Sequence, residues 1–211
     1  MNDVIVKSLT VSMFGTNCYI AACPQTKEAV IIDPGADGKG IIDTVKSLQY
    51  DVKYILNTHG HIDHIGANGN LKAEYKVPIL LHEKDLKIYN NPGFGLGLVL
   101  KKQPQPDRYI TDGDIIEFGS ESLTVIETPG HSPGGVCFHS GSLLFCGDTL
   151  FAGSIGRTDL AGGSFETLMK SICEKLLPLP DDTVVYPGHG PATSVGDEAS
   201  SNPFILNYLQ G

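Results

Sequence analysis

A short segment near residue 60 concentrates side chains that can bind a metal ion. Residues 58–64 have the sequence Thr-His-Gly-His-Ile-Asp-His, so three imidazoles and one carboxylate lie within six positions, from His59 to His64. Imidazole nitrogens together with a carboxylate favour Zn, Fe or Mn over Ca or Mg. The segment directly follows an apolar run, 54–57, that is typical of a strand. The pattern therefore predicts a metal site at a strand end and not a loop of capping histidines.

One loop cannot surround a metal ion, so further ligands are expected on other turns. Three turns offer them: His131 lies between Pro-Gly and Ser-Pro-Gly, Asp148 follows Cys-Gly, and His189 lies between two glycines after a proline. Each of these residues follows a predicted strand. Because loops at strand ends are where ligands converge in α/β architectures, we expect these three side chains to meet the histidine loop.

The elements that must position these residues are short strands and amphipathic helices. Apolar runs bounded by Gly, Pro and polar turns predict strands, namely Val4–Leu9, Asn17–Ala22, Ala29–Asp33, Tyr54–Asn57, Pro78–Leu81, Ile115–Phe118, Leu123–Glu127, Val136–His139, Leu143–Cys146 and Thr183–Tyr186. Helical spacing of apolar residues predicts helices, namely Lys39–Gln49, Asn68–Tyr75, Glu83–Tyr89 and Phe165–Leu177, the last capped by Ser164. Strands followed by helices, twice over, predict a layered α/β fold with helices outside paired sheets.

Composition excludes several classes of protein. The 211 residues carry 24 acidic and 15 basic side chains, a net charge of −9 that disfavours nucleic-acid binding. No apolar stretch approaches the roughly 18 residues of a membrane span, and the first residues do not resemble a signal peptide. The five cysteines form no C-x-x-C pair, so we expect reduced thiols in a cytoplasmic protein. No linker divides the chain, which predicts one domain over residues 1–211.

Residues 91–106 are rich in glycine and proline and are expected to form a loop. Two interpretations remain open for it, a surface excursion or a lid over the site.

The metal-ligand pattern resembles that of the metallo-β-lactamase-fold hydrolases. The resemblance extends over nearly the whole chain and includes Asn17-Cys18-Tyr19-Ile20, Ile31-Ile32-Asp33-Pro34-Gly35 and Asn202-Pro203-Phe204. It implies a four-layer αββα fold with two sheets between helices. It also implies two divalent metal ions, with zinc expected and iron or manganese as alternatives.

Roles for individual residues follow from the same resemblance. The first metal would be bound by His59, His61 and His131, the second by Asp63, His64 and His189, with Asp148 bridging both. Asp63 would also orient the nucleophile, a hydroxide shared by the two metals. Asp33 would support the histidine loop without binding metal.

Within this group, the motifs are most similar to those of hydroxyacylglutathione hydrolases, also called glyoxalase II. These enzymes cleave small-molecule thioesters of the S-2-hydroxyacylglutathione type. Many β-lactamases of the fold carry a cysteine where this chain has Asp148, so hydrolysis of β-lactams is not expected. Only 22 of the 211 residues follow His189, so we expect the short, single-domain form without a C-terminal helical domain that binds glutathione.

The stretch Gly156-Arg157-Thr158-Asp159 departs from the family pattern, because Thr158 replaces an aromatic residue of the glutathione site. Arg157 keeps a cation that could bind a substrate carboxylate. Alternatively, Arg157 and Asp159 form an ion pair that braces the loop. His82 and His139 lie outside the family motif and are expected to be capping or surface residues.

Two alternative functions belong to other classes. Persulfide dioxygenases share the fold and much of the motif but hold one iron, on positions of the His59, His131 and Asp148 type. The compact region from Phe14 to Tyr19 favours the hydrolase. The second alternative is a metal-binding module without turnover. For the hydrolase we expect a monomer or homodimer without nucleic-acid or membrane partners.

Overall fold

The computed structural model describes residues 4–91 and 102–210, and two six-stranded sheets form its centre. The first sheet has the order β1(Ile5–Val11)-β2(Thr16–Ala22)-β3(Glu28–Ile32)-β4(Asp51–Leu56)-β5(Ile79–Leu81)-β6(Arg108–Tyr109). The second has the order β14(Thr193–Ser194)-β13(Val184–Pro187)-β10(Leu143–Gly147)-β9(Val136–Ser140)-β8(Glu121–Glu127)-β7(Ile115–Phe118). A small ribbon pairs β11(Leu150–Phe151) with β12(Ser154–Ile155).

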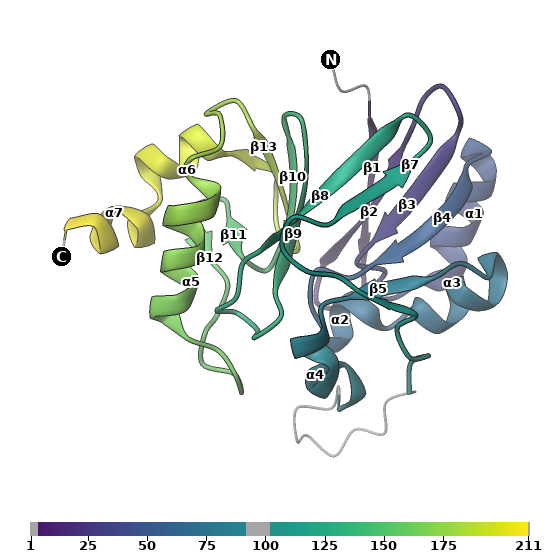
Figure 1. The fold of residues 1–211 in the computed structure, drawn as a ribbon, viewed down its shortest axis with the longest axis horizontal. Helices are drawn as coiled ribbons and strands as arrows, with labels where there is room; N and C mark the ends of the chain where they lie inside the picture. The colour runs from purple at the N-terminus through teal and green to yellow at the C-terminus, as the bar shows by residue number, and fades with distance from the viewer. Residues whose placement is uncertain (1–3, 92–101, 211) are drawn as a thin grey trace.

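Helices cover the outer face of each sheet, as Figure 1 shows. On the first sheet these are α1(Gly38–Leu48) and α3(Asn68–Tyr75); on the second they are α5(Phe165–Ser171), α6(Val195–Ser201) and α7(Pro203–Gln210). The remaining helical segments are α2(Ile62–Ile65), the 3₁₀ turn η1(Glu83–Asp85), α4(Leu86–Asn90) and the π-helical turn η2(Ile172–Leu176). The structure thus confirms the predicted four-layer αββα arrangement.

Alternation along β2 shows how the sequence produces these layers. Tyr19 and Ala21 join the core between the two sheets, whereas Cys18, Ile20 and Ala22 join the core beneath α1 and α3. Successive strand residues point to opposite faces, so a strand that is apolar at every position is buried on both sides. β2 is buried along its whole length, which suits a strand between two apolar layers.

All predicted strands and helices are present, with ends that differ by a few residues. The helix Asn68–Tyr75 has the predicted bounds, and the Ser164 side chain caps α5 by accepting a hydrogen bond from the Thr167 amide. Two predicted helices are composite: residues 83–89 begin as η1 before α4, and α5 continues into η2.

Among the described residues, four strands and the helices α2, α6 and α7 were not predicted, and the strands have weak sequence signals. The strands β6, β11, β12 and β14 have two residues each, too few to show a period. Helix α7 did have a signal, because Asn202 accepts a hydrogen bond from the Phe204 amide and Pro203 begins the helix. Asn at the cap and Pro at the first position are typical of helix starts.

Most of the predicted loop 91–106 lies outside the described residues. Of the part that is described, Gln103 is buried, accepts a hydrogen bond from the Gly69 amide and donates one to the Gly66 carbonyl. The cysteines are free thiols, four of them buried. Across residues 4–91 and 102–210, no helix is both long enough and apolar enough to cross a membrane.

Candidate metal centre

Two pairs of parallel strands bring the predicted ligands together. In the first sheet β3 runs parallel to β4, which places Asp33 beside the loop that begins at Thr58. In the second sheet β10 runs parallel to β13, which places Asp148 beside His189. The two edges are joined by hydrogen bonds from the Asn17 amide to Gly188 and from the Val136 amide to Thr58. Residues far apart in the chain therefore meet at one edge of the paired sheets.

Asp33 organises the histidine loop through three hydrogen bonds. Its Oδ1 accepts from the Thr58 amide at 2.8 Å, and its Oδ2 accepts from Thr58 Oγ1 at 2.6 Å and from His64 Nδ1 at 2.9 Å. Because the Thr58 hydroxyl donates to Asp33, it accepts from His59 Nδ1 at 3.0 Å. The Nδ1 atoms of His59 and His64 therefore carry protons, so Nε2 is the atom of each ring that is left to bind a metal ion.

His131 and His189 are oriented in the same way by backbone carbonyls. His131 Nδ1 donates to the Arg157 carbonyl at 2.8 Å, and His189 Nδ1 donates to the Phe14 carbonyl at 3.2 Å. The Nε2 atom of His131 then lies 2.9 Å from Nδ1 of His61. Four of the five predicted histidine ligands therefore have Nδ1 in a hydrogen bond that orients the ring. The Nε2 atom of each of these four faces the other ligands.

The ligand atoms fall into two groups. Within each group the atoms lie within 4.8 Å of one another; one group is His59, His61 and His131, and the other is Asp63, His64 and His189. Asp33 also lies within this distance of His59 and His64, but its oxygens already accept the hydrogen bonds described above.

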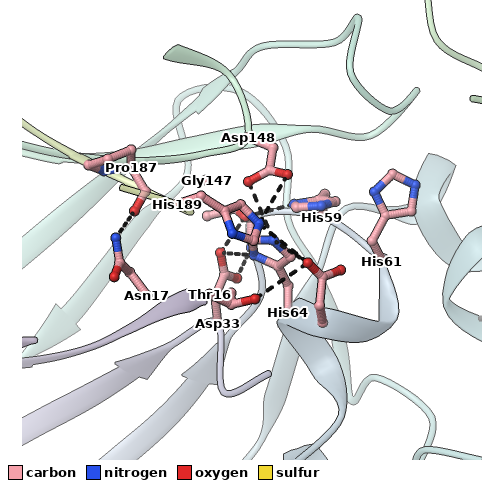
Figure 2. Close-up of polar contacts among 12 residues, drawn as sticks. Thr16, Asn17, Asp33, His59, His61, His64, Gly147, Asp148, Pro187 and His189 are labelled. Atoms are coloured by element: carbon pink, nitrogen blue, oxygen red, sulfur yellow. Dashed lines mark hydrogen bonds and ion pairs between the residues drawn. The ribbon is translucent and has the colours of Figure 1, made fainter. Parts of the chain in front are cut away.

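Asp148 lies between the two groups. Its Oδ1 is 3.4 Å from His64 Nε2, and its Oδ2 is 3.5 Å from His131 Nε2 and 3.6 Å from His189 Nε2. Figure 2 shows Asp148, His59, His64 and His189 directed toward one another. The structure thus brings together all seven predicted ligands, with Asp148 in the position of a bridge.

The donor atoms fit a bound cation. Six buried side-chain atoms of the described residues have no hydrogen-bond partner, and three of the six are in this site: His59 Nε2, His64 Nε2 and Asp148 Oδ1. An unsatisfied buried polar atom costs about 1–3 kcal/mol, so three of them in one place need an explanation. A divalent cation would satisfy all three, and a set of imidazoles with two carboxylates suits Zn, Fe or Mn.

Protonation differs between the two groups. In the first, burial and the neighbouring histidines lower the pKa of His59, and burial with His131 lowers the pKa of His61 to about 4. In the second, burial opposes protonation of His64, but Asp148 and Asp33 outweigh it and raise its pKa. The hydrogen bond to Asp63 raises the pKa of His189.

The two carboxylates that face the histidines remain ionised. Burial raises the pKa of both Asp63 and Asp148, but His189 and His64 bring the pKa of Asp63 below its usual range. Mainly through His64, the histidines do the same for the pKa of Asp148. Both side chains can therefore act as anionic metal ligands near neutral pH.

Residues of β2 donate hydrogen bonds to the turn that carries His189, a role that the sequence did not reveal. Asn17 Nδ2 donates to the carbonyls of Pro187 (3.1 Å) and Gly190 (2.8 Å), and the Tyr19 hydroxyl donates to Pro187 at 2.6 Å. Thr16 Oγ1 donates to Asp63 at 3.4 Å. Asn17 and Tyr19 belong to the stretch that carried the family resemblance, and Thr16 directly precedes that stretch, but only the fold shows what these residues hold.

Arg157 has the ion pair that its alternative interpretation predicts. Its guanidinium donates to both carboxylate oxygens of Asp159, at 2.8 and 2.7 Å, and both side chains are exposed. Its backbone carbonyl accepts the hydrogen bond from His131. A solvent-exposed pair of this kind contributes little to stability, so the guanidinium can exchange Asp159 for another carboxylate.

The two remaining histidines lie outside both ligand groups. His82 is a capping residue, as predicted: its Nδ1 accepts from the Lys84 amide, and its Nε2 lies 2.9 Å from Glu127. His139 is half-buried within β9.

Comparison with known proteins agrees with this geometry. Residues 12–189 match the profile of the metallo-beta-lactamase superfamily. The chain is 38% identical, over 95% of its length and 97% of the relative's, to a Haemophilus influenzae protein named hydroxyacylglutathione hydrolase GloC. The chain therefore belongs to the metallo-beta-lactamase superfamily, the family that its motifs predicted.

Similar solved structures carry several different names. BLEG-1, described as a B3 metallo-beta-lactamase, has 38% identity and a TM-score of 0.89, over 95% of this chain and 99% of its own. TTHA1623 in a di-iron-bound form has 37% identity and a TM-score of 0.86, over 94% and 100%. ETHE1 from Myxococcus xanthus has 26% identity and a TM-score of 0.80, over 98% and 90%.

Proposed function

We propose that the chain is a dinuclear metal-dependent hydrolase that cleaves thioesters of the S-2-hydroxyacylglutathione type. Membership of a metallo-hydrolase superfamily supports an enzyme, and the relative named GloC supports the substrate class. The observation that carries the proposal is the pair of ligand groups on either side of Asp148, with three buried atoms that have no hydrogen-bond partner.

The residues of each group have distinct places in this proposal. His59, His61 and His131 would hold one metal ion, Asp63, His64 and His189 would hold the other, and Asp148 would contact both. Zinc is the expected metal, and the di-iron form of TTHA1623 supports iron as an alternative. When bound, such a pair of ions supplies a hydroxide nucleophile near neutral pH. The ions also polarise the substrate carbonyl that the hydroxide attacks.

Side chains of the site would orient the nucleophile and bind the charged part of the substrate. Asp63 is ionised and partly exposed, so its carboxylate can accept a hydrogen bond from the nucleophile and orient it. The Thr16 hydroxyl contact restrains the Asp63 carboxylate. Arg157 would bind a substrate carboxylate by exchanging it for Asp159, which the exposed position of that ion pair permits.

Two other activities are favoured by specific structural likenesses. The similarity to ETHE1 favours the alternative of an iron persulfide dioxygenase with a single metal. The similarity to BLEG-1 favours β-lactam hydrolysis, against the expectation drawn from Asp148. A metal-binding module without turnover is the remaining alternative. Each of these predicts a different assay result from a thioesterase.

The location and partners of the proposed enzyme are inferred from its cysteines and its net charge. We propose a cytoplasmic enzyme for a small-molecule thioester, active as a monomer or homodimer, without nucleic-acid or membrane partners. The free cysteines and the net charge of −9 support this setting.

A panel assay on metal-loaded protein tests the proposal. S-lactoylglutathione, an acyl thioester that lacks glutathione, a chromogenic cephalosporin and glutathione persulfide with oxygen-uptake detection would be compared at equal enzyme concentration. We expect thioester cleavage, measured as released thiol, to be the fastest reaction and to be lost on chelation. Faster oxygen uptake or cephalosporin hydrolysis would contradict the proposal, as would the absence of any turnover.

A further inference from the structure

Another buried carboxylate, besides Asp33, lies beside the metal centre. Asp85 ends the short turn η1, between β5 and α4, and its side chain is fully buried. It is absent from both ligand groups. Burial of an ionisable group is costly unless hydrogen bonds compensate, so the partners of Asp85 indicate what it does.

Asp85 accepts hydrogen bonds from both loops that carry the first ligand group. Its Oδ2 accepts from the Gly60 amide at 2.8 Å and from Ser132 Oγ at 2.7 Å, and its Oδ1 accepts from the Gly134 amide at 2.6 Å. Gly60 lies between His59 and His61, and Ser132 directly follows His131. One side chain therefore connects the two segments that carry all three histidines.

The packing around Asp85 leaves little freedom to these loops. A Cβ atom on Gly60 would lie 2.9 Å from the Asp85 carbonyl oxygen and 2.9 Å from the Tyr89 amide. A Cβ atom on Gly134 would lie 2.8 Å from the Asp85 amide and 2.9 Å from its Oδ1. Glycine at both positions permits this close approach.

We propose that Asp85 is a positioning residue that sets the distance between the two loops of the first ligand group and thereby the affinity of that group for metal. The proposal rests on the metal centre proposed above. It gives the first group a second support of its own. Asp33 contacts Thr58 and His64 and so serves both groups, whereas Asp85 contacts Gly60, before His61, and Ser132 and Gly134, after His131.

The chemistry of the contacts explains why a carboxylate suits this place. Residues 57–61 and 128–135 are outside regular strands and helices. The Val136 amide joins the two segments at Thr58, and Asp85 adds hydrogen bonds at Gly60, Ser132 and Gly134, nearer to the histidines. A buried carboxylate accepts several hydrogen bonds that are stronger than those to a neutral amide. Loss of such a support to metal ligands typically lowers metal affinity by about 10–100-fold.

The test is the zinc affinity of Asp85→Asn measured in a His189→Ala background, which leaves the first ligand group as the intact one. Asparagine keeps the size of the side chain but turns an NH₂ group toward N–H or O–H donors. We expect zinc affinity, from competition with a chromophoric chelator, to fall by about 10–100-fold relative to His189→Ala alone. Cobalt substitution should also give a changed visible spectrum, because the ligand geometry relaxes.

Glu198→Gln in the same background is the matched control. Glu198 is also a buried carboxylate with three donors, the Gly153 amide (2.9 Å), Thr193 Oγ1 (2.7 Å) and Asn202 Nδ2 (2.7 Å). It contacts none of the ligands in these hydrogen bonds. We expect Glu198→Gln to lower the Tm of the metal-free protein but to leave zinc affinity and the cobalt spectrum unchanged.

Equal zinc affinity in the Asp85→Asn protein and its control would overturn the proposal. If Asp85→Asn does not fold, Ser132→Ala removes only one of the three hydrogen bonds and should give a smaller loss of zinc affinity; no loss would again overturn it. Because the readout is metal binding, it is separate from turnover. Failure of the thioesterase assay would contradict the proposed function and leave the result for Asp85 intact.

Discussion

The two ligand groups differ in burial, support and charge. His59, His61 and His131 are 2%, 4% and 5% exposed. In the second group His64 is fully buried, but the side chains of His189 and Asp63 are 28% and 17% exposed. The first group is held between Asp33 and Asp85, and the second is held by Asp33 and by the turn before β2. In the proposed dinuclear centre, the first group would therefore hold the more enclosed metal, and the second would hold the metal nearer to solvent and substrate.

Removal of the Asp148 carboxylate should have the largest effect, because Asp148 lies next to histidines of both groups. We expect Asp148→Ala to lower kcat/KM for a thioester by about 100-fold or more, with less than two metals bound per chain. Steady-state kinetics on protein reloaded with zinc would measure this. His61→Ala, which removes a ligand of one group only, should likewise abolish turnover while the second group still binds metal. Activity above a few per cent in either variant would contradict the ligand assignment.

Loss of the shared support should have the next largest effect. Asp33 has a φ of +50°, a conformation that asparagine tolerates, so Asp33→Asn preserves the backbone. It should lower the affinity for both metals by about 10–100-fold, since Thr58 and His64 lose their acceptor. Zinc titration of metal-free protein would show this for both sites. If only one site weakens, Asp33 supports a single group and the comparison drawn above needs revision.

The two groups should release their metals at different pH values. The raised pKa values of His64 and His189 mean that protons compete with the second metal at a higher pH than with the first, where the pKa of His61 is about 4. As the pH falls, the second metal should therefore leave before the first. Metal content after dialysis against chelator-free buffers of decreasing pH would measure the order. Simultaneous release of both metals would contradict it.

The smallest expected effect concerns the substrate. Arg157→Ala should raise KM several-fold for thioesters that carry a carboxylate and leave KM for neutral thioesters unchanged, because only the former can use the guanidinium. Asp159→Asn is the matched control, since it removes the competing anion and keeps Arg157. If KM changes equally for both kinds of thioester, Arg157 does not bind the substrate carboxylate and only stabilises the loop.

The ligands could be predicted from the sequence because their spacing is local or follows strand ends. His59 to His64 lie in one segment, and the other three ligands follow apolar runs that form β8, β10 and β13. Of the supports, Asp33 was predicted from the family resemblance, but Asp85 could not be predicted. Asp85 lies in a stretch that was predicted as a helix, and its partners Gly60, Ser132 and Gly134 are distant in sequence. A hydrogen bond between distant loops leaves no periodic signal in the chain.

The metal content of the purified protein tests the central claim most directly. Elemental analysis of protein isolated without added metal should give about two divalent ions per chain, one for each ligand group. The same analysis of His189→Ala should give about one. One iron per chain in the unaltered protein, retained in full by His189→Ala, would contradict a dinuclear centre and favour the dioxygenase.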